Sequence, residues 1–175
     1  MFPVQWSVKH IIGLILSLAW PVFSQATSTN HYDTVKQSRW FAISGGFANA
    51  ATSEAHALTA ICGQTNAVAT LQRLLQEKEP APQLYGLLGL QVLVSLSASN
   101  DVPHSQELEK AAGEASIALS RALPLLLSSE KNVRVLDGCI AGERQVAEVA
   151  RQIRGNQWRL RSMPLPDGKY APRTD

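Results

Sequence analysis

The 175-residue chain has few aromatic residues and only two cysteines, and it lacks the short motifs of common enzyme families. No G-x-S-x-G, H-E-x-x-H, G-x-x-x-x-G-K-[ST] or EF-hand calcium loop occurs in it. These absences argue against an α/β-hydrolase, a zincin protease, a P-loop NTPase and an EF-hand protein. The sequence therefore predicts no catalytic residue, no cofactor and no metal site.

The chain also lacks a large excess of either positive or negative charge. Sixteen basic and fourteen acidic side chains give a formal net charge of +2. Proteins that bind nucleic acid mainly through phosphates carry a much larger basic excess. We therefore expect no nucleic acid partner.

The first 26 residues have the pattern of a secretory signal peptide. Lys9 precedes an apolar run from Ile11 to Trp20, and Ser24 and Ala26 then provide a small-residue cleavage site. The run is too short to cross a hydrocarbon core, which needs about 20 apolar residues. The sequence predicts cleavage after Ala26 and an exported chain, periplasmic or secreted, without a stable membrane span. A retained anchor is the alternative.

The two cysteines, Cys62 and Cys139, are predicted to form a disulfide, because an exported chain meets an oxidising compartment. Two buried thiols or one reactive thiol are the alternatives. Neither cysteine belongs to a C-x-x-C pair, and no nearby residues have zinc-site spacing.

Apolar and small residues recur at helical spacing along about five segments. Glycine or proline bounds most of them. The predicted helices span 47–62 with Ser44 as a possible N-cap, 66–79, 82–96, 108–126 with a kink or end at Pro124, and about 142–154.

Outside the helices, Val133 and Val135 alternate with Arg134 and indicate a short extended segment before a turn at Gly138. Residues 27–38 are polar without periodicity and are expected to form a mobile arm. Residues 163–175 contain three prolines and are expected to be an irregular tail. The remaining 39–162 are predicted to be one all-α domain, a small helical bundle.

The segment 82–96 is apolar nearly all round. A helix without a polar face lies either in a protein core or in lipid, and this one is too short for lipid. We expect a central core helix in which Gly86 and Gly89 allow a neighbouring helix to approach closely. An exposed hydrophobic groove for a partner is the alternative.

Residues 66–96 combine an amphipathic helix, the turn sequence "EPAPQ" and a leucine-rich second helix. This hairpin resembles a HEAT-type helical repeat. The resemblance covers one hairpin only, with no second copy at a period of roughly 40 residues. It implies a scaffold of short, stacked helical hairpins that binds other proteins, as an alternative to a simple bundle.

Isolated polar residues give little indication of chemistry. Glu54 and His56 are two residues apart, so their side chains diverge on a helix and cannot easily share a metal ion. Ser44 and His104 are remote from them in sequence. An enzyme site would require these four residues to converge in the fold.

The C-terminal segment "RQIRGNQWRLR" is the strongest indication of binding. It carries Arg151, Arg154, Trp158, Arg159 and Arg161 without an acidic residue. Arginine and tryptophan are enriched at binding hot spots, and guanidinium groups pair with anions. The structural alternative is that the arginines suit a helix C-terminus and that Trp158 folds back onto the core.

The sequence most strongly predicts an exported, non-catalytic protein-binding or scaffold module whose partner is another protein. One alternative is an envelope-surface binder of anions or lipid headgroups that uses the arginine-rich segment. The other is an enzyme whose site is assembled from the dispersed histidine, glutamate and serine residues.

Overall fold

A computed structural model of the chain describes residues 26–45, 50–99, 105–158, 160, 162–164 and 170–172. The chain divides into a unit of residues Met1–Asn30 and a compact unit of His31–Asp175. The predicted signal peptide, apart from Ala26, lies outside the described residues.

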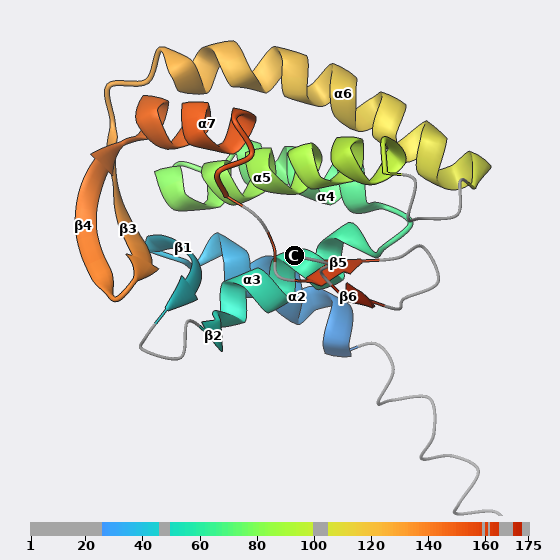
Figure 1. The fold of residues 1–175 in the computed structure, drawn as a ribbon, viewed down its shortest axis with the longest axis horizontal. Helices are drawn as coiled ribbons and strands as arrows, with labels where there is room; N and C mark the ends of the chain where they lie inside the picture. Colours follow the sequence, from blue (N-terminus) through green and yellow to red (C-terminus); the bar gives the residue numbers. More distant parts are fainter. Residues whose placement is uncertain are drawn as a thin grey trace, which may run out of the picture. The chain divides into compact units, whose positions relative to one another are not determined.

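The described elements are helices joined to short strands (Figure 1). The helices are α2 (Ala26–Lys36), α3 (Ser53–Cys62), α4 (Ala67–Leu75), α5 (Pro80–Ser97), α6 (Gln106–Leu127) and α7 (Val146–Arg154). The strands are β1 (Trp40–Gly45), β2 (Ala50–Ala51), β3 (Asn132–Gly138), β4 (Ile140–Gln145), β5 (Ser162–Pro164) and β6 (Tyr170–Pro172).

A mixed four-stranded sheet shows that the all-α prediction was wrong. Its strand order is β2-β1-β3-β4, with β1 parallel to β3 and β3 antiparallel to β4. Figure 1 shows β4 at the outer edge of this sheet. Strands β5 and β6 form a separate antiparallel pair within the segment expected to be an irregular tail.

The sheet escaped prediction because its strands carry weak local patterns. Strand β4 buries none of its side chains, so it shows no alternation of apolar and polar residues. The sequence predicts that the last helix begins at about Gly142, whereas α7 begins only at Val146. The parallel pairing joins Trp40 to Arg134, so it depends on contacts far apart in the chain. The extended segment and turn predicted around Val133 and Gly138 are confirmed as β3 and its hairpin.

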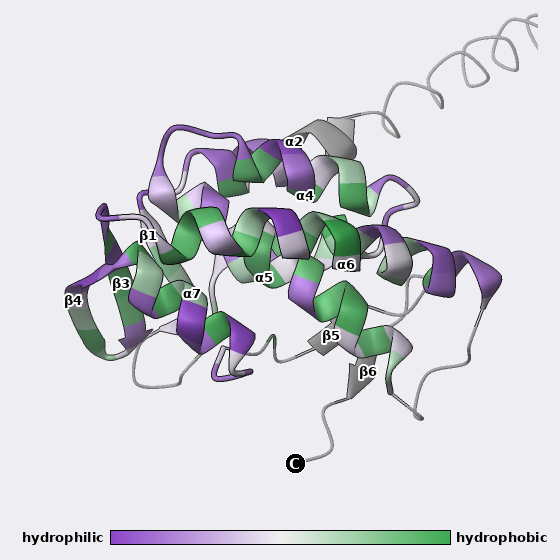
Figure 2. Ribbon diagram, turned by 90° about the horizontal axis from the view of Figure 1, so that it is seen from above, coloured by the Kyte–Doolittle hydropathy of each residue, from purple (hydrophilic) through white to green (hydrophobic). Residues whose placement is uncertain are grey.

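Helix α5 is the centre of the core, as the sequence predicts. Its residues from Leu84 to Leu90 are all buried. A methyl group at Gly86 would lie 2.8 Å from the backbone oxygen of Leu71, and one at Gly89 would collide with the Leu71 side chain. The two glycines therefore permit the close approach of α4 to α5. Figure 2 shows α6 crossing the molecule between α4 and α7.

The predicted N-cap of α3 is wrong, and α6 does not end at Pro124. The hydroxyl of Thr52, not Ser44, caps α3 by accepting from the Ala55 N–H at 3.1 Å, and Ser44 lies in β1. Helix α6 continues through Pro124 to Leu127.

The polar segment expected to be an arm contributes to α2, where the hydroxyl of Tyr32 donates to Glu77 at 2.6 Å.

The predicted disulfide is wrong. Cys62 is buried in α3 beneath α5, and its thiol lies 3.8 Å from the Gly89 carbonyl. Cys139 is exposed at the turn between β3 and β4, where Gly138 adopts a left-handed φ of 61°. A disulfide needs Cα atoms within about 7 Å and converging Cβ bonds, which these two positions do not provide. Both cysteines are free thiols.

The described helices include none that is both long and apolar enough to cross a membrane.

Candidate functional site

The arginine-rich segment does not form one described surface. Arg151 and Arg154 are exposed in the last turn of α7. Trp158 instead packs edge-on against Phe41, with ring centroids 4.9 Å apart, and its indole N–H donates to Gln152 at 3.0 Å. The folded-back tryptophan is therefore the arrangement present. Arg159 and Arg161 lie outside the described residues.

The dispersed polar residues do not form a described catalytic site. Glu54 accepts a hydrogen bond from its neighbour Ser53 at 2.9 Å, and His56 is exposed. His104 lies outside the described residues. Among the described side chains, no three His, Cys, Asp or Glu residues are placed to hold a metal ion.

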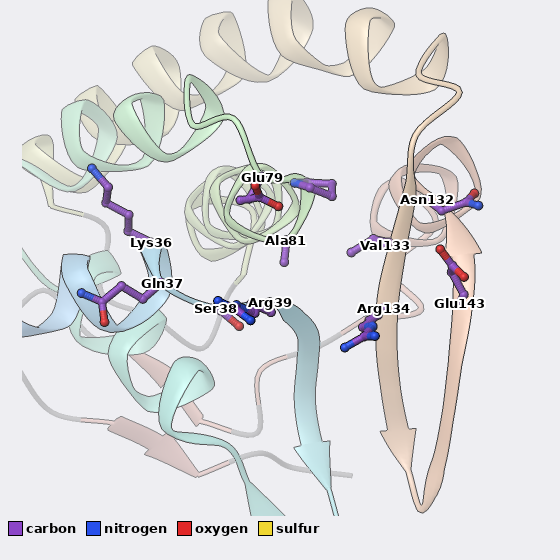
Figure 3. Close-up of a pocket in the computed structure, with 11 residues that line it drawn as sticks. Lys36, Gln37, Ser38, Arg39, Glu79, Ala81, Asn132, Val133, Arg134 and Glu143 are labelled. Carbon is purple, nitrogen blue, oxygen red and sulfur yellow. The ribbon is translucent and has the colours of Figure 1, made fainter.

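A cleft of about 900 Å³ lies where β1, β3 and α5 begin and where α2 ends (Figure 3). Buried Ser38 fixes the chain at its base by donating to the Trp40 carbonyl at 2.7 Å. Ala81 of the first turn of α5 lines the wall beside β3. The charged residues that line the cleft are Lys36, Arg39, Arg134, Glu79 and Glu143.

The two arginines of this cleft lack an acidic partner among the described residues. Lys36 is paired with Glu77 at 3.2 Å, and Glu77 does not line the cleft. The guanidinium of Arg134 lies 5.3 Å from the centroid of the Trp40 ring. The two acidic residues that line the cleft, Glu79 and Glu143, form no described salt bridge. The arginines are thus available to an anionic group from outside.

Trp40, Arg134 and Glu143 form a row across three strands of the sheet. The strand register places Trp40 beside Arg134 and Arg134 opposite Glu143, so these side chains share one face. Trp40 is 38% exposed, which is unusual for so large a ring. The opposite face carries the buried residues Phe41, Ile43, Val133 and Val135 and packs against helices.

On the β1 side of the sheet, the N–H and C=O groups of Ala42 form hydrogen bonds to side chains of the same molecule. The hydroxyl of Tyr85 accepts from the Ala42 N–H at 2.9 Å and also lies 2.9 Å from the Ala42 carbonyl. Thr52 donates to the same carbonyl at 2.9 Å. Burial raises the pKa of Tyr85, which keeps its hydroxyl protonated as a donor. This edge is closed to further pairing at Ala42.

The edge on the β4 side is open. The Val146 N–H donates to the Lys131 carbonyl at 2.9 Å, and the two-residue period of an antiparallel ladder then turns Gly142 and Arg144 toward β3. The backbone groups of Ala141, Glu143 and Gln145 consequently point outward. The carbonyl of Gln145, as the N-cap residue of α7, accepts the first hydrogen bond of that helix. Within the described part of the chain, the N–H and C=O groups of Ala141 and Glu143 and the N–H of Gln145 have no backbone partner. Ile140, at the start of the strand, is 73% exposed.

Sequence reasoning missed this site because its parts are far apart in the chain. Arg39, Trp40 and Arg134 meet only through the parallel pairing of β1 with β3. The extended segment at Val133 and Val135 was the one available signal, and it located β3 but not its neighbours.

Comparisons with known proteins do not add a family. A scan against protein-family models, a search of curated proteins and a search of solved structures each give no match to this chain. The α4–α5 hairpin that resembles a HEAT repeat therefore gains no support as a family relationship.

Proposed function

We propose that the protein is a non-catalytic binding module that recognises an extended segment of another protein by adding it as a strand to β4. The open backbone edge of β4 is the observation that carries the proposal. An unpaired strand edge is a template for pairing with another chain, and proteins use such edges to bind peptides.

The contrast between the two edges supports a binding role for β4. Folded proteins usually block a strand edge, as Tyr85 and Thr52 do at Ala42. No equivalent side chain closes the outward groups of Ala141 and Glu143 or the N–H of Gln145 within the described residues. A partner strand there would satisfy these groups and extend the sheet.

The neighbouring cleft suggests that the partner segment carries an acidic side chain. Arg39 and Arg134 have no acidic partner among the described residues, and Trp40 lies beside them. Arginine and tryptophan are the residues most often found at binding hot spots. A carboxylate that reached the cleft would gain a charge-assisted hydrogen bond.

Glu143→Pro tests strand addition while sparing the fold. Proline removes the N–H of Glu143, which faces away from β3, and edge strands tolerate proline at such positions. Glu143→Ala removes the same side chain but keeps the N–H, so it is the matched control. Linear peptides selected from a displayed random library on the full chain serve as the probe. We expect Glu143→Pro to weaken their binding about tenfold or more relative to Glu143→Ala, through loss of backbone pairing.

Three outcomes would contradict the proposal. The first is that no linear peptide binds the wild-type chain. The second is equal binding by Glu143→Pro and Glu143→Ala. The third is a dimer of the chain alone that dissociates in Glu143→Pro, because that would assign the edge to a second copy. Slowed amide exchange of Ala141, Glu143 and Gln145 on peptide binding would support it.

Export and the use of Arg151 and Arg154 for anions stay predictions. The exposure of both arginines is compatible with the latter, and strong weakening of binding by salt would be its signature.

A further inference from the structure

A second cleft, of about 520 Å³, lies between α4, the start of α5 and the C-terminal half of α6. Figure 2 shows α4 alongside α6. Pockets for small molecules usually have volumes of about 300–1,000 Å³ and combine an apolar lining with a few polar groups. This cleft therefore has the size and composition of a site for a small ligand.

The charge in this cleft has one sign. Arg121 and Lys131 line it, and no acidic residue does. Arg121 is exposed and forms no described hydrogen bond or ion pair. The ammonium of Lys131 has one described contact, a long one of 3.4 Å to the Lys78 carbonyl, so it retains donors for another group. The amides of Gln72 and Gln76 add neutral donors.

The rest of the lining is apolar. Leu126 is buried, Leu75 and Ala122 are half-buried, and Leu125 is 73% exposed. Exposed leucine on a helix that otherwise directs its leucines inward leaves apolar surface uncovered at the cleft. An aliphatic chain lying over Leu75, Ala122 and Leu125 would remove that surface from water.

We propose that this cleft binds a small amphipathic carboxylate, with the carboxylate between Arg121 and Lys131 and the aliphatic part over the leucines. The two cations without a lining acid select an anionic head group, and the adjoining apolar wall selects a short hydrocarbon tail. The cleft shares no lining residue with the cleft beside β4, so this proposal is independent of strand addition.

Octanoate is the probe, and octylammonium and 1-octanol are the matched ligands of opposite and zero charge. Titration of the full chain, followed by backbone amide chemical shifts, should give saturable octanoate binding centred on α4 and α6. Because both cations are solvent-exposed, each contributes a modest charge-assisted contact, and the double variant Arg121→Gln/Lys131→Gln should bind octanoate about tenfold more weakly. Lys110→Gln is the control variant. Lys110 is exposed on α6, the helix that carries Arg121, but it lies outside this cleft.

The proposal is overturned if octanoate does not saturate, if octanol or octylammonium binds equally well, or if the double variant keeps wild-type affinity. Equal weakening by Lys110→Gln would also overturn it, because the effect would then come from net charge. Binding to anionic phospholipid vesicles without saturable octanoate binding would assign the surface to a membrane instead.

Discussion

At the scale of single residues, the two glycines of α5 are the clearest example of agreement between sequence and structure. Glycine lowers helix stability, so its presence in a buried helix indicates a packing constraint. Gly86 faces the backbone of Leu71, and Gly89 faces the Leu71 side chain. The expectation of a close helix approach was confirmed, although the sequence could not name Leu71 as the neighbour.

We predict that Gly86→Ala destabilises the protein by about 1–3 kcal/mol, because its new methyl group would lie 2.8 Å from a backbone oxygen that cannot move aside easily. Gly113→Ala is the control in α6, where a methyl group would meet no atom within 4 Å. That substitution should stabilise by about 0.5–1 kcal/mol through helix propensity. Urea unfolding measures both; a stabilised Gly86→Ala would show that the α4–α5 spacing is loose.

For the two cysteines, the sequence prediction and the structure disagree. The expected oxidising compartment and the presence of two cysteines favoured a disulfide, but pairing depends on where the fold places each Cα atom. Cys62 belongs to the core, whereas Cys139 is exposed at a hairpin turn. No local feature of either sequence neighbourhood could reveal their separation.

At the scale of elements, helices with strong apolar stripes were predictable and the sheet was not. Helices α4, α5 and α6 begin and end near proline, glycine and polar capping residues that the sequence displays. Strand β1 is too short and too uniformly apolar to be distinguished from a buried helix turn. Strand β4 buries none of its side chains, so its sequence shows no hydrophobic pattern that could predict it.

The closed edge of β1 gives a prediction about how an element is stabilised. Tyr85→Phe removes the hydroxyl that pairs with the Ala42 N–H and carbonyl, leaving a buried donor without its partner. We expect a loss of about 1–3 kcal/mol in unfolding free energy and faster amide exchange at Ala42. Tyr32→Phe, which removes a half-buried hydroxyl bonded to Glu77, should cost less than about 1 kcal/mol.

Equal losses in the two tyrosine variants, or an unchanged exchange rate at Ala42, would argue that the Tyr85 hydroxyl does not close this edge.

At the scale of the whole molecule, the burial of titratable groups makes the unfolding free energy depend on pH in the alkaline range. Burial raises the pKa of the Cys62 thiol to about 12, from an ordinary value of 9.0, and it raises the pKa of Tyr85 in the same direction. Above pH 9 the unfolded chain therefore releases protons that the folded chain retains. The contribution of the buried Cys62 thiol to the unfolding free energy is fully present below pH 9 and is lost progressively as the pH rises toward 12.

We predict that the unfolding free energy of the wild-type protein, measured by urea titration, falls as the pH rises above 9. Cys62→Ala should flatten part of this dependence, because it removes the buried thiol. If Cys62→Ala kept the full wild-type slope, the Cys62 thiol would not be the group responsible.

The sequence alone determined the features that depend on neighbours along the chain. These include the core helix α5 with its two close-approach glycines, the amphipathic α4 and the turn at Gly138. Periodicity, capping and turn chemistry act within a few residues, so they are visible without a structure.

Only the tertiary structure decided the features that depend on distant pairing. The parallel pairing of β1 with β3 and the cleft with Arg39 and Arg134 arise when residues about 90 positions apart become neighbours. The separation of Cys62 from Cys139 and the packing of Trp158 against Phe41 have the same origin. Such contacts are chosen by packing of the whole core, and no short stretch of sequence encodes them.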